Sequence, residues 1–154
     1  MNSFKPQEKM SVRRLEDDWK IQTTKGNALF EKSSFCDARD TYRITVRLAR
    51  WLLQRQTECR EEGIPEQALH NIACANLGNT FLELGHLKTA ENCFLDALDV
   101  ASLAYNQKTP EVSGSDLRVA VLNYTGFCQR SARPPDTHLL ASVGRRTATS
   151  SLSP

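Results

Sequence analysis

The sequence predicts an all-α fold, and three observations support that prediction. Apolar residues recur every three or four positions through most of the chain, as they do along one face of a helix. No segment alternates apolar and polar residues convincingly over the length of a strand. A pattern of glycine, alanine and aromatic residues also occurs twice, and such self-similarity is typical of stacked helical units.

Each helix can be placed by its apolar spacing and by the residues that interrupt it. The first ends before Ser33, because the serine pair there can cap the start of a second helix. Gly63 and Pro65 end the second helix and begin the third, and Gly85 ends the third. The expected helices are about residues 12–32, 35–62, 66–84, 87–105 and 116–130, with 106–114 as a loop.

Length and charge predict one domain with flexible ends. The chain has 154 residues and a net charge of +2, and residues 1–130 are neutral, with 17 basic and 17 acidic side chains. Residues 131–154 hold three of the six prolines and eight Ser or Thr, so they offer too little apolar surface to fold. We expect a flexible lead over 1–10, a helical domain over 11–130, and a disordered, basic Ser/Thr/Pro-rich tail over 131–154.

Cysteine usage and hydropathy predict a cytoplasmic protein. The five cysteines are an odd number, and no two lie closer than 15 residues, so neither a zinc-type couplet nor a redox motif is present. Free thiols fit a reducing compartment. No apolar run approaches the roughly 18 residues of a membrane span, and the first thirty residues lack the apolar core of a secretion signal.

Catalytic and metal-binding motifs are missing from the sequence. There is no Gly-rich phosphate loop, paired-carboxylate signature or Ser/His/Asp arrangement. His70 and Cys74 lie four residues apart on one helix, but two ligands do not make a metal site, so packing is the simpler role. We therefore expect a protein that is not an enzyme and that has no cofactor and no metal.

The internal repeat has an offset of 52 residues. Gly26-Asn27 matches Gly78-Asn79, Ala38 matches Ala90, and Tyr42 matches Phe94. These residues are similar to the pattern of the tetratricopeptide repeat (TPR) family. The resemblance covers about residues 19–104 and implies antiparallel helical hairpins in which the glycine lets two helices approach closely. The offset exceeds the usual period of about 34 residues, so the second helix of the first hairpin is expected to be extended, and the helix over 116–130 is expected to be a cap.

The TPR resemblance implies a protein–protein interaction module of adaptor or chaperone-like type. Members of the family bind a peptide or partner surface on the concave face, which the first helix of each hairpin lines. Asn side chains suit this role because an amide both donates and accepts. Some members capture a C-terminal carboxylate with two Asn and several basic residues, and Asn27 and Asn76 stand at the Asn places. The implied partner-binding residues are Thr23, Asn27, Phe30, Ile72, Asn76, Asn79, Leu82 and Glu83.

An alternative binding surface comes from four arginines in the second helix. Arg39, Arg43, Arg47 and Arg50 are spaced four, four and three residues apart, so they form one stripe on the helix. Such a stripe suits an anionic ligand or a nucleic acid. A nucleic-acid partner is not expected, because the body of the protein is neutral and no aromatic residues are interleaved. A solvated face with acidic neighbours is the simpler interpretation.

The same helix predicts self-association. Its second apolar strip, Ile44, Leu48, Trp51 and Leu52, has no assigned cover in a chain of two repeats. An uncovered apolar strip of this kind usually marks an interface. We expect a two-fold homodimer, and the alternative is that residues 1–18 fold back over the strip.

Overall fold

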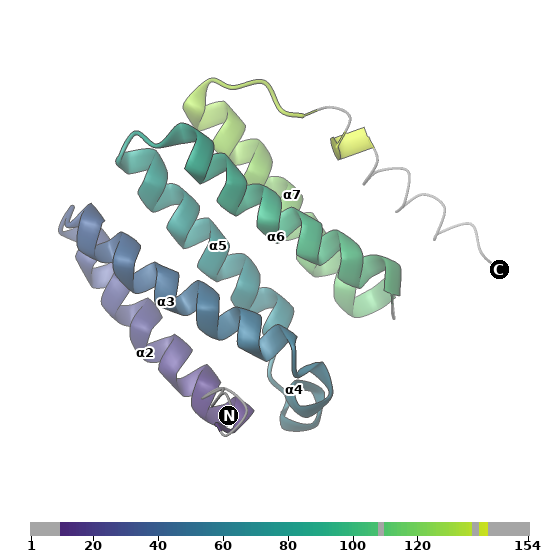
Figure 1. Ribbon diagram of the computed structural model, residues 1–154. Coiled ribbons are helices and arrows are strands. Elements are labelled where there is room, and N and C mark those ends of the chain that lie inside the picture. The colour runs from purple at the N-terminus through teal and green to yellow at the C-terminus, as the bar shows by residue number, and fades with distance from the viewer. Residues whose placement is uncertain (1–9, 108–109, 137–138, 142–154) are drawn as a thin grey trace, which may run out of the picture.

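The computed structural model describes residues 10–107, 110–136 and 139–141, and within these residues the fold is all-helical, as the sequence predicts. Successive helices lie side by side across the molecule, from α2 and α3 at one end to α6 and α7 at the other (Figure 1). Each long helix packs against the next, and α5 also contacts α7. The helices are α2 (Val12–Glu31), α3 (Phe35–Leu53), α4 (Gln56–Glu62), α5 (Glu66–Glu83), α6 (Leu87–Gln107) and α7 (Pro110–Ser131).

The helix boundaries confirm three of the expected helices and correct two. The expected second helix does not continue to residue 62, because it ends at Leu53, and a separate short helix, α4, follows. The Cys59 thiol of α4 is fully buried and lies 3.5 Å from the Leu52 carbonyl oxygen, so the break lets α4 turn back against α3. The expected loop over 106–114 is also wrong: α6 extends to Gln107, and α7 begins at Pro110. Proline suits the first position of a helix, because no carbonyl acceptor is available there.

The two hairpins share a close approach between glycine and an aromatic ring. A Cβ placed on Gly26 would lie 2.5 Å from Tyr42, and one placed on Gly78 would lie 2.6 Å from Phe94. Both rings are buried, and Ala38 and Ala90 beside them are fully buried. The glycine is therefore required by packing in both units. The fold is helical-repeat-like: the contact of Gly26 with Tyr42 in the first hairpin is repeated 52 residues later by the contact of Gly78 with Phe94.

The hairpin turns repeat as well. Ser33 has a φ of 59° and Gly85 has a φ of 79°, so both adopt the left-handed conformation that closes a helix. In each case the next residue donates its N–H to a carbonyl of the last helical turn, Ser34 to Leu29 and His86 to Phe81. Ala132 ends α7 with a φ of 53° and the same bond pattern. The short helix α4 ends in the same way at Gly63, with a φ of 68°, so this turn closes four of the described helices.

The apolar strip assigned to self-association is largely inside the monomer. Leu48 and Leu52 are buried, and Trp51 is half-buried against the same core, so the expectation that they lie uncovered is wrong. Val12 and Leu15 of α2 and Cys59 of α4 belong to this core, which the sequence pattern of the second helix alone does not reveal. Ile44 alone of the four is exposed, at 41%.

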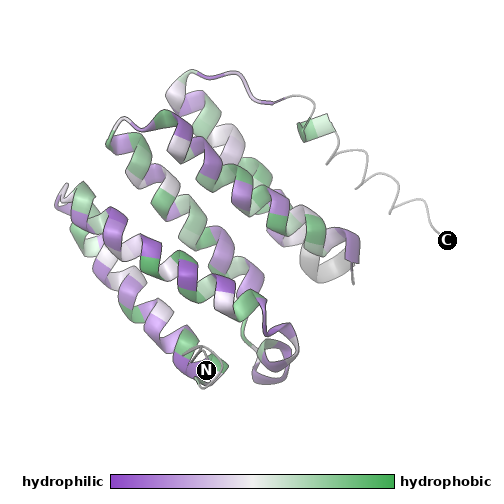
Figure 2. Cartoon of the chain, in the orientation of Figure 1, coloured by the Kyte–Doolittle hydropathy of each residue, from purple (hydrophilic) through white to green (hydrophobic). Residues whose placement is uncertain are grey.

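In the described part of the chain, hydrophobic and hydrophilic residues are interspersed along the helices (Figure 2). In residues 10–107, 110–136 and 139–141, no helix has the length and hydropathy needed to cross a bilayer. Leu139 and Leu140, from the segment expected to be a tail, pack against the core, and the Asp136 carboxylate accepts the Leu139 N–H at 3.0 Å. The rest of that segment from residue 142 onward, and most of the expected lead over 1–10, lie outside the described residues.

Candidate functional site

A surface hollow of about 180 Å³ brings together four of the eight predicted partner-binding residues. Asn27 and Phe30 come from the last turns of α2, and Asn76 and Asn79 come from the facing part of α5. The repeat explains this meeting, since Asn27 and Asn79 follow the glycines at which the helices of each hairpin approach most closely. Glu31 and Tyr42 complete the lining.

The Asn27 side chain is held in place by Tyr42. The Tyr42 hydroxyl donates to Asn27 Oδ1 at 2.7 Å across the α2–α3 hairpin. Burial, and then the negative charge of Glu31, raise the pKa of Tyr42, so its hydroxyl stays protonated and remains a donor at neutral pH. Because Oδ1 is engaged, the Asn27 amide presents its Nδ2 donors to a ligand. Among the described residues, none accepts a hydrogen bond from that nitrogen.

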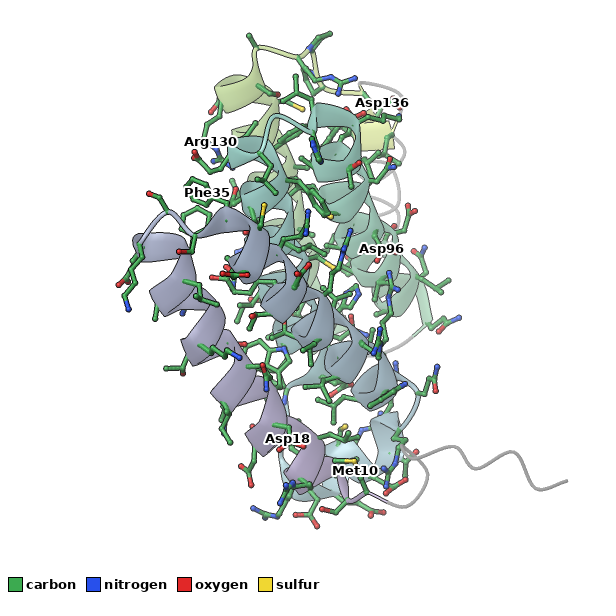
Figure 3. The ribbon with its side chains drawn as sticks, turned by 60° about the vertical axis from the view of Figure 1, so that its left-hand side comes forward. Met10, Asp18, Phe35, Asp96, Arg130 and Asp136 are labelled. Atoms are coloured by element: carbon green, nitrogen blue, oxygen red, sulfur yellow. The ribbon has the colours of Figure 1, made fainter. Side chains whose placement is uncertain are left out.

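Asn79 is held in the same way by a residue of α7. Arg130 Nη2 donates to Asn79 Oδ1 at 2.7 Å, so this oxygen is engaged, and among the described residues none accepts a hydrogen bond from the Asn79 amide nitrogen. Figure 3 shows Arg130 and Phe35 on the left-hand edge of the bundle, with Asp96 on the other side. The hollow is lined from α2, α3 and α5, and Arg130 of α7 places a positive charge beside the Asn79 amide. Sequence reasoning missed Arg130, because it lies 51 residues from its partner.

Four predicted partner-binding residues do not line the hollow. Thr23 is half-buried, and its Oγ1 finds no hydrogen-bond partner among the described residues. Ile72 is exposed near the start of α5, about a turn before Asn76. Leu82 packs partly against the core, and Glu83 is exposed at the end of α5. These residues extend along α2 and α5 away from the hollow, so they widen the candidate surface without joining its centre.

The arginine stripe of α3 is mostly paired with acidic groups. Asp40 lies 3.0 Å from Arg39 and 3.8 Å from Arg43, and Asp96 of α6 lies 2.7 Å from Arg50. The hydrogen bond to Asp96 is the main cause that raises the pKa of Arg50. Arg47 is exposed and has no acidic partner in the described part of the chain. An anion would therefore compete with the protein's own carboxylates at three of the four positions.

A groove of about 410 Å³ lies between α3, α5 and α6 and is distinct from the Asn27–Asn79 hollow. Arg43 and Arg50 line it, and the Arg43 guanidinium lies 5.5 Å from the centre of the Phe81 ring. Two of its lining residues, Cys74 and Asp96, lie close to His70, whose Nε2 is 3.5 Å from the Cys74 sulfur and 3.8 Å from Asp96 Oδ2.

The buried cysteine and histidine of this cluster do not form a catalytic relay. Burial is the main cause that lowers the pKa of His70, so the imidazole is neutral at pH 7, and burial raises the pKa of the Cys74 thiol. Cys74 and Asp96 both lie near the same ring nitrogen, Nε2, whereas a nucleophile relay needs the acid and the thiol on opposite nitrogens. The thiol is therefore protonated and inert as a nucleophile in this arrangement.

No protein-family model, curated protein or solved structure matches this chain. The functional assignment therefore depends on the chain's own geometry.

Proposed function

We propose that this chain is a non-enzymatic TPR-type interaction module that binds a peptide or partner surface across the first helices of its hairpins. The single observation that carries the proposal is the hollow that Asn27, Asn76 and Asn79 line together with Phe30. An apolar ring flanked by fixed amide donors suits an extended peptide, whose carbonyls need donors and whose side chains need apolar contact.

The repeat geometry supports the TPR assignment. Both hairpins have the glycine–aromatic approach at matching positions, and α2, α5 and α7 close with a left-handed residue at Ser33, Gly85 and Ala132, as α4 also does at Gly63. Repeats of this kind form extended concave surfaces from their first helices. The candidate residues lie on α2 and α5, the first helices of the two hairpins, and Arg130 of α7 bonds to one of them.

The charge of the site favours a partner that carries an acceptor-rich or acidic segment. Arg130 contributes a cation beside Asn79, while Glu31 lies at the α2 end of the hollow. A peptide carbonyl or carboxylate near Asn79 would thus meet both an amide donor and a positive charge. An adaptor role in the cytoplasm is consistent with five free cysteines.

The decisive experiment is a peptide-array screen with the full chain, followed by affinity measurement of the best binder by fluorescence anisotropy. Asn79→Ala and Asn27→Ala should each weaken binding by roughly 1–3 kcal/mol while leaving the circular dichroism spectrum unchanged. Asn92→Ala is the matched control, because Asn92 is an exposed amide of α6 in the other groove. Equal binding by parent and by both hollow variants would refute the proposal.

Anion or nucleic-acid binding through Arg39, Arg43, Arg47 and Arg50 is the alternative function. It predicts a steep loss of affinity between low and moderate salt, because binding then releases counterions. Binding in the hollow predicts a weak salt dependence and no response to Arg47→Ala. Self-association through Ile44, Leu48, Trp51 and Leu52 stays a prediction, now with Ile44 as its main exposed residue.

A further inference from the structure

The packing of α5 against α6 brings three metal-ligating side chains together. His70 and Cys74 lie one helical turn apart on α5, and Asp96 projects from α6. Their donor atoms are separated by 3.5 Å (Cys74 Sγ to His70 Nε2), 3.8 Å (His70 Nε2 to Asp96 Oδ2) and 4.0 Å (Cys74 Sγ to Asp96 Oδ2). The three atoms therefore form a nearly regular triangle.

The size of this triangle matches one face of a zinc coordination sphere. Zinc binds nitrogen, oxygen and sulfur ligands at about 2.0–2.3 Å in a tetrahedron, which separates neighbouring donor atoms by roughly 3.3–3.7 Å. The separation of 3.5 Å lies within this range, and those of 3.8 and 4.0 Å exceed it by a few tenths of an ångström, a shift that side-chain rotation can supply. The donors are also suitable in kind, because a set of imidazole, thiolate and carboxylate favours zinc over magnesium or calcium, which prefer oxygen ligands alone.

We propose that His70 Nε2, Cys74 Sγ and Asp96 Oδ2 bind one Zn²⁺ ion beside the groove between α3, α5 and α6. Cys74 and Asp96 both line this groove, which has room for a water molecule as a fourth ligand and gives the ion a path of entry. On binding, the Cys74 thiol loses its proton to solvent, and the thiolate coordinates the ion. The ion joins α5 to α6 and so ties together the two helices of the second hairpin.

Arg50 provides an independent feature of the same site. Its Nη2 lies 2.7 Å from Asp96 Oδ2, the oxygen that faces His70, so the guanidinium supplies positive charge to this carboxylate when no ion is bound. The Arg50 side chain is 57% exposed and is free to move toward the other carboxylate oxygen or into the groove. Zinc and Arg50 therefore compete for one carboxylate oxygen, and removal of the arginine should favour zinc.

The test is titration of the reduced, chelator-treated full chain with Co²⁺, a spectroscopic substitute for zinc, followed by competition with Zn²⁺. A thiolate–cobalt charge-transfer band should saturate at one equivalent, and zinc should abolish it. Cys74→Ser should remove the band, and His70→Gln and Asp96→Asn should each weaken metal affinity at least tenfold. Asp96 is partly exposed, so the Asp96→Asn variant tests the site without disturbing the core.

Two controls distinguish this ligand set from adventitious thiol binding. Cys93→Ser removes a different thiol of the same groove and Cys36→Ser removes the exposed one, and both variants should retain the band and the affinity. Arg50→Gln should bind cobalt several-fold more tightly than the parent. Absence of a stoichiometric band, loss of the band in Cys93→Ser, or unchanged affinity in both Asp96→Asn and Arg50→Gln would overturn the proposal.

Discussion

Gly78→Ala should destabilise the protein even though alanine is the better helix former. The added Cβ would lie 2.6 Å from Phe94 Cε2, well inside van der Waals contact. Phe94 has little room to retreat, because it is 1% exposed and stacks on Phe127 with ring centres 5.1 Å apart. Overpacking of this kind costs about 1–3 kcal/mol, while the gain in helix propensity is at most about 1 kcal/mol. With the full gain subtracted, we expect a net loss of up to about 2 kcal/mol.

Urea unfolding followed by circular dichroism measures this effect, with Gly114→Ala as the matched control. A Cβ on Gly114 would meet Tyr105 Cε2 at 3.6 Å, an ordinary contact, so the same substitution should there be neutral or stabilising by up to about 1 kcal/mol. Gly26→Ala should behave like Gly78→Ala, because Tyr42 occupies the equivalent place. If Gly78→Ala and Gly114→Ala shift stability in the same direction, the close-packing argument for the repeat is refuted.

Three further predictions concern the turn, the monomer surface and the thiols. Ser33→Gly should raise the free energy of unfolding by roughly 0.5–1 kcal/mol, because the turn holds serine at a φ of 59°. Gly85→Ser should lower the free energy of unfolding for the same reason. If calorimetry shows no difference between each variant and the parent, the shared turn is contradicted. Ile44→Glu should reduce any homodimer seen by light scattering without loss of stability, and a parent chain that is monomeric at micromolar concentration would refute the dimer. A thiol reagent should modify Cys36 first and the buried Cys74 only on unfolding, and fast labelling that persists in Cys36→Ser would contradict the burial pattern.

The sequence alone could predict the repeat and its turns, because they depend on local residue types. Ser33 and Gly85 align at an offset of 52 residues, and both prove to be the left-handed residues that close a helix. Gly26 and Gly78 likewise mark the closest helix approaches in the two hairpins. In each case a small residue at a fixed spacing from its neighbours determines the local geometry, so the sequence alone is enough to predict it.

The sequence predicts only some residues of each candidate site, because contacts between distant segments of the chain complete both sites. The hollow brings together Asn27, Asn76 and Asn79, which the repeat pattern singles out, but Arg130 reaches Asn79 from a helix with no recognised repeat pattern. Likewise His70 and Cys74 are a visible pair, while Asp96 joins them from the next helix. Nothing local in the chain marks either partner, since a single arginine or aspartate on an exposed helix face is ordinary.

The break between α3 and α4 shows the same limit and can be tested with proline. Residues 52–58 contain neither Gly nor Pro, so the sequence predicts a continuous helix. Arg55 instead has a φ of −125° and a ψ of 45° and precedes a new helix that begins at Gln56. Because the first N–H groups of a helix lack a partner, Gln56→Pro should cost less than about 1 kcal/mol if the break is present. In a continuous helix it would cost about 3 kcal/mol or more, as we expect for Arg47→Pro at an exposed interior position of α3. Urea unfolding measures both variants. If the free energy of unfolding falls equally and by a large amount in the two, the helix is continuous, and the turn that places Cys59 against Leu52 is refuted.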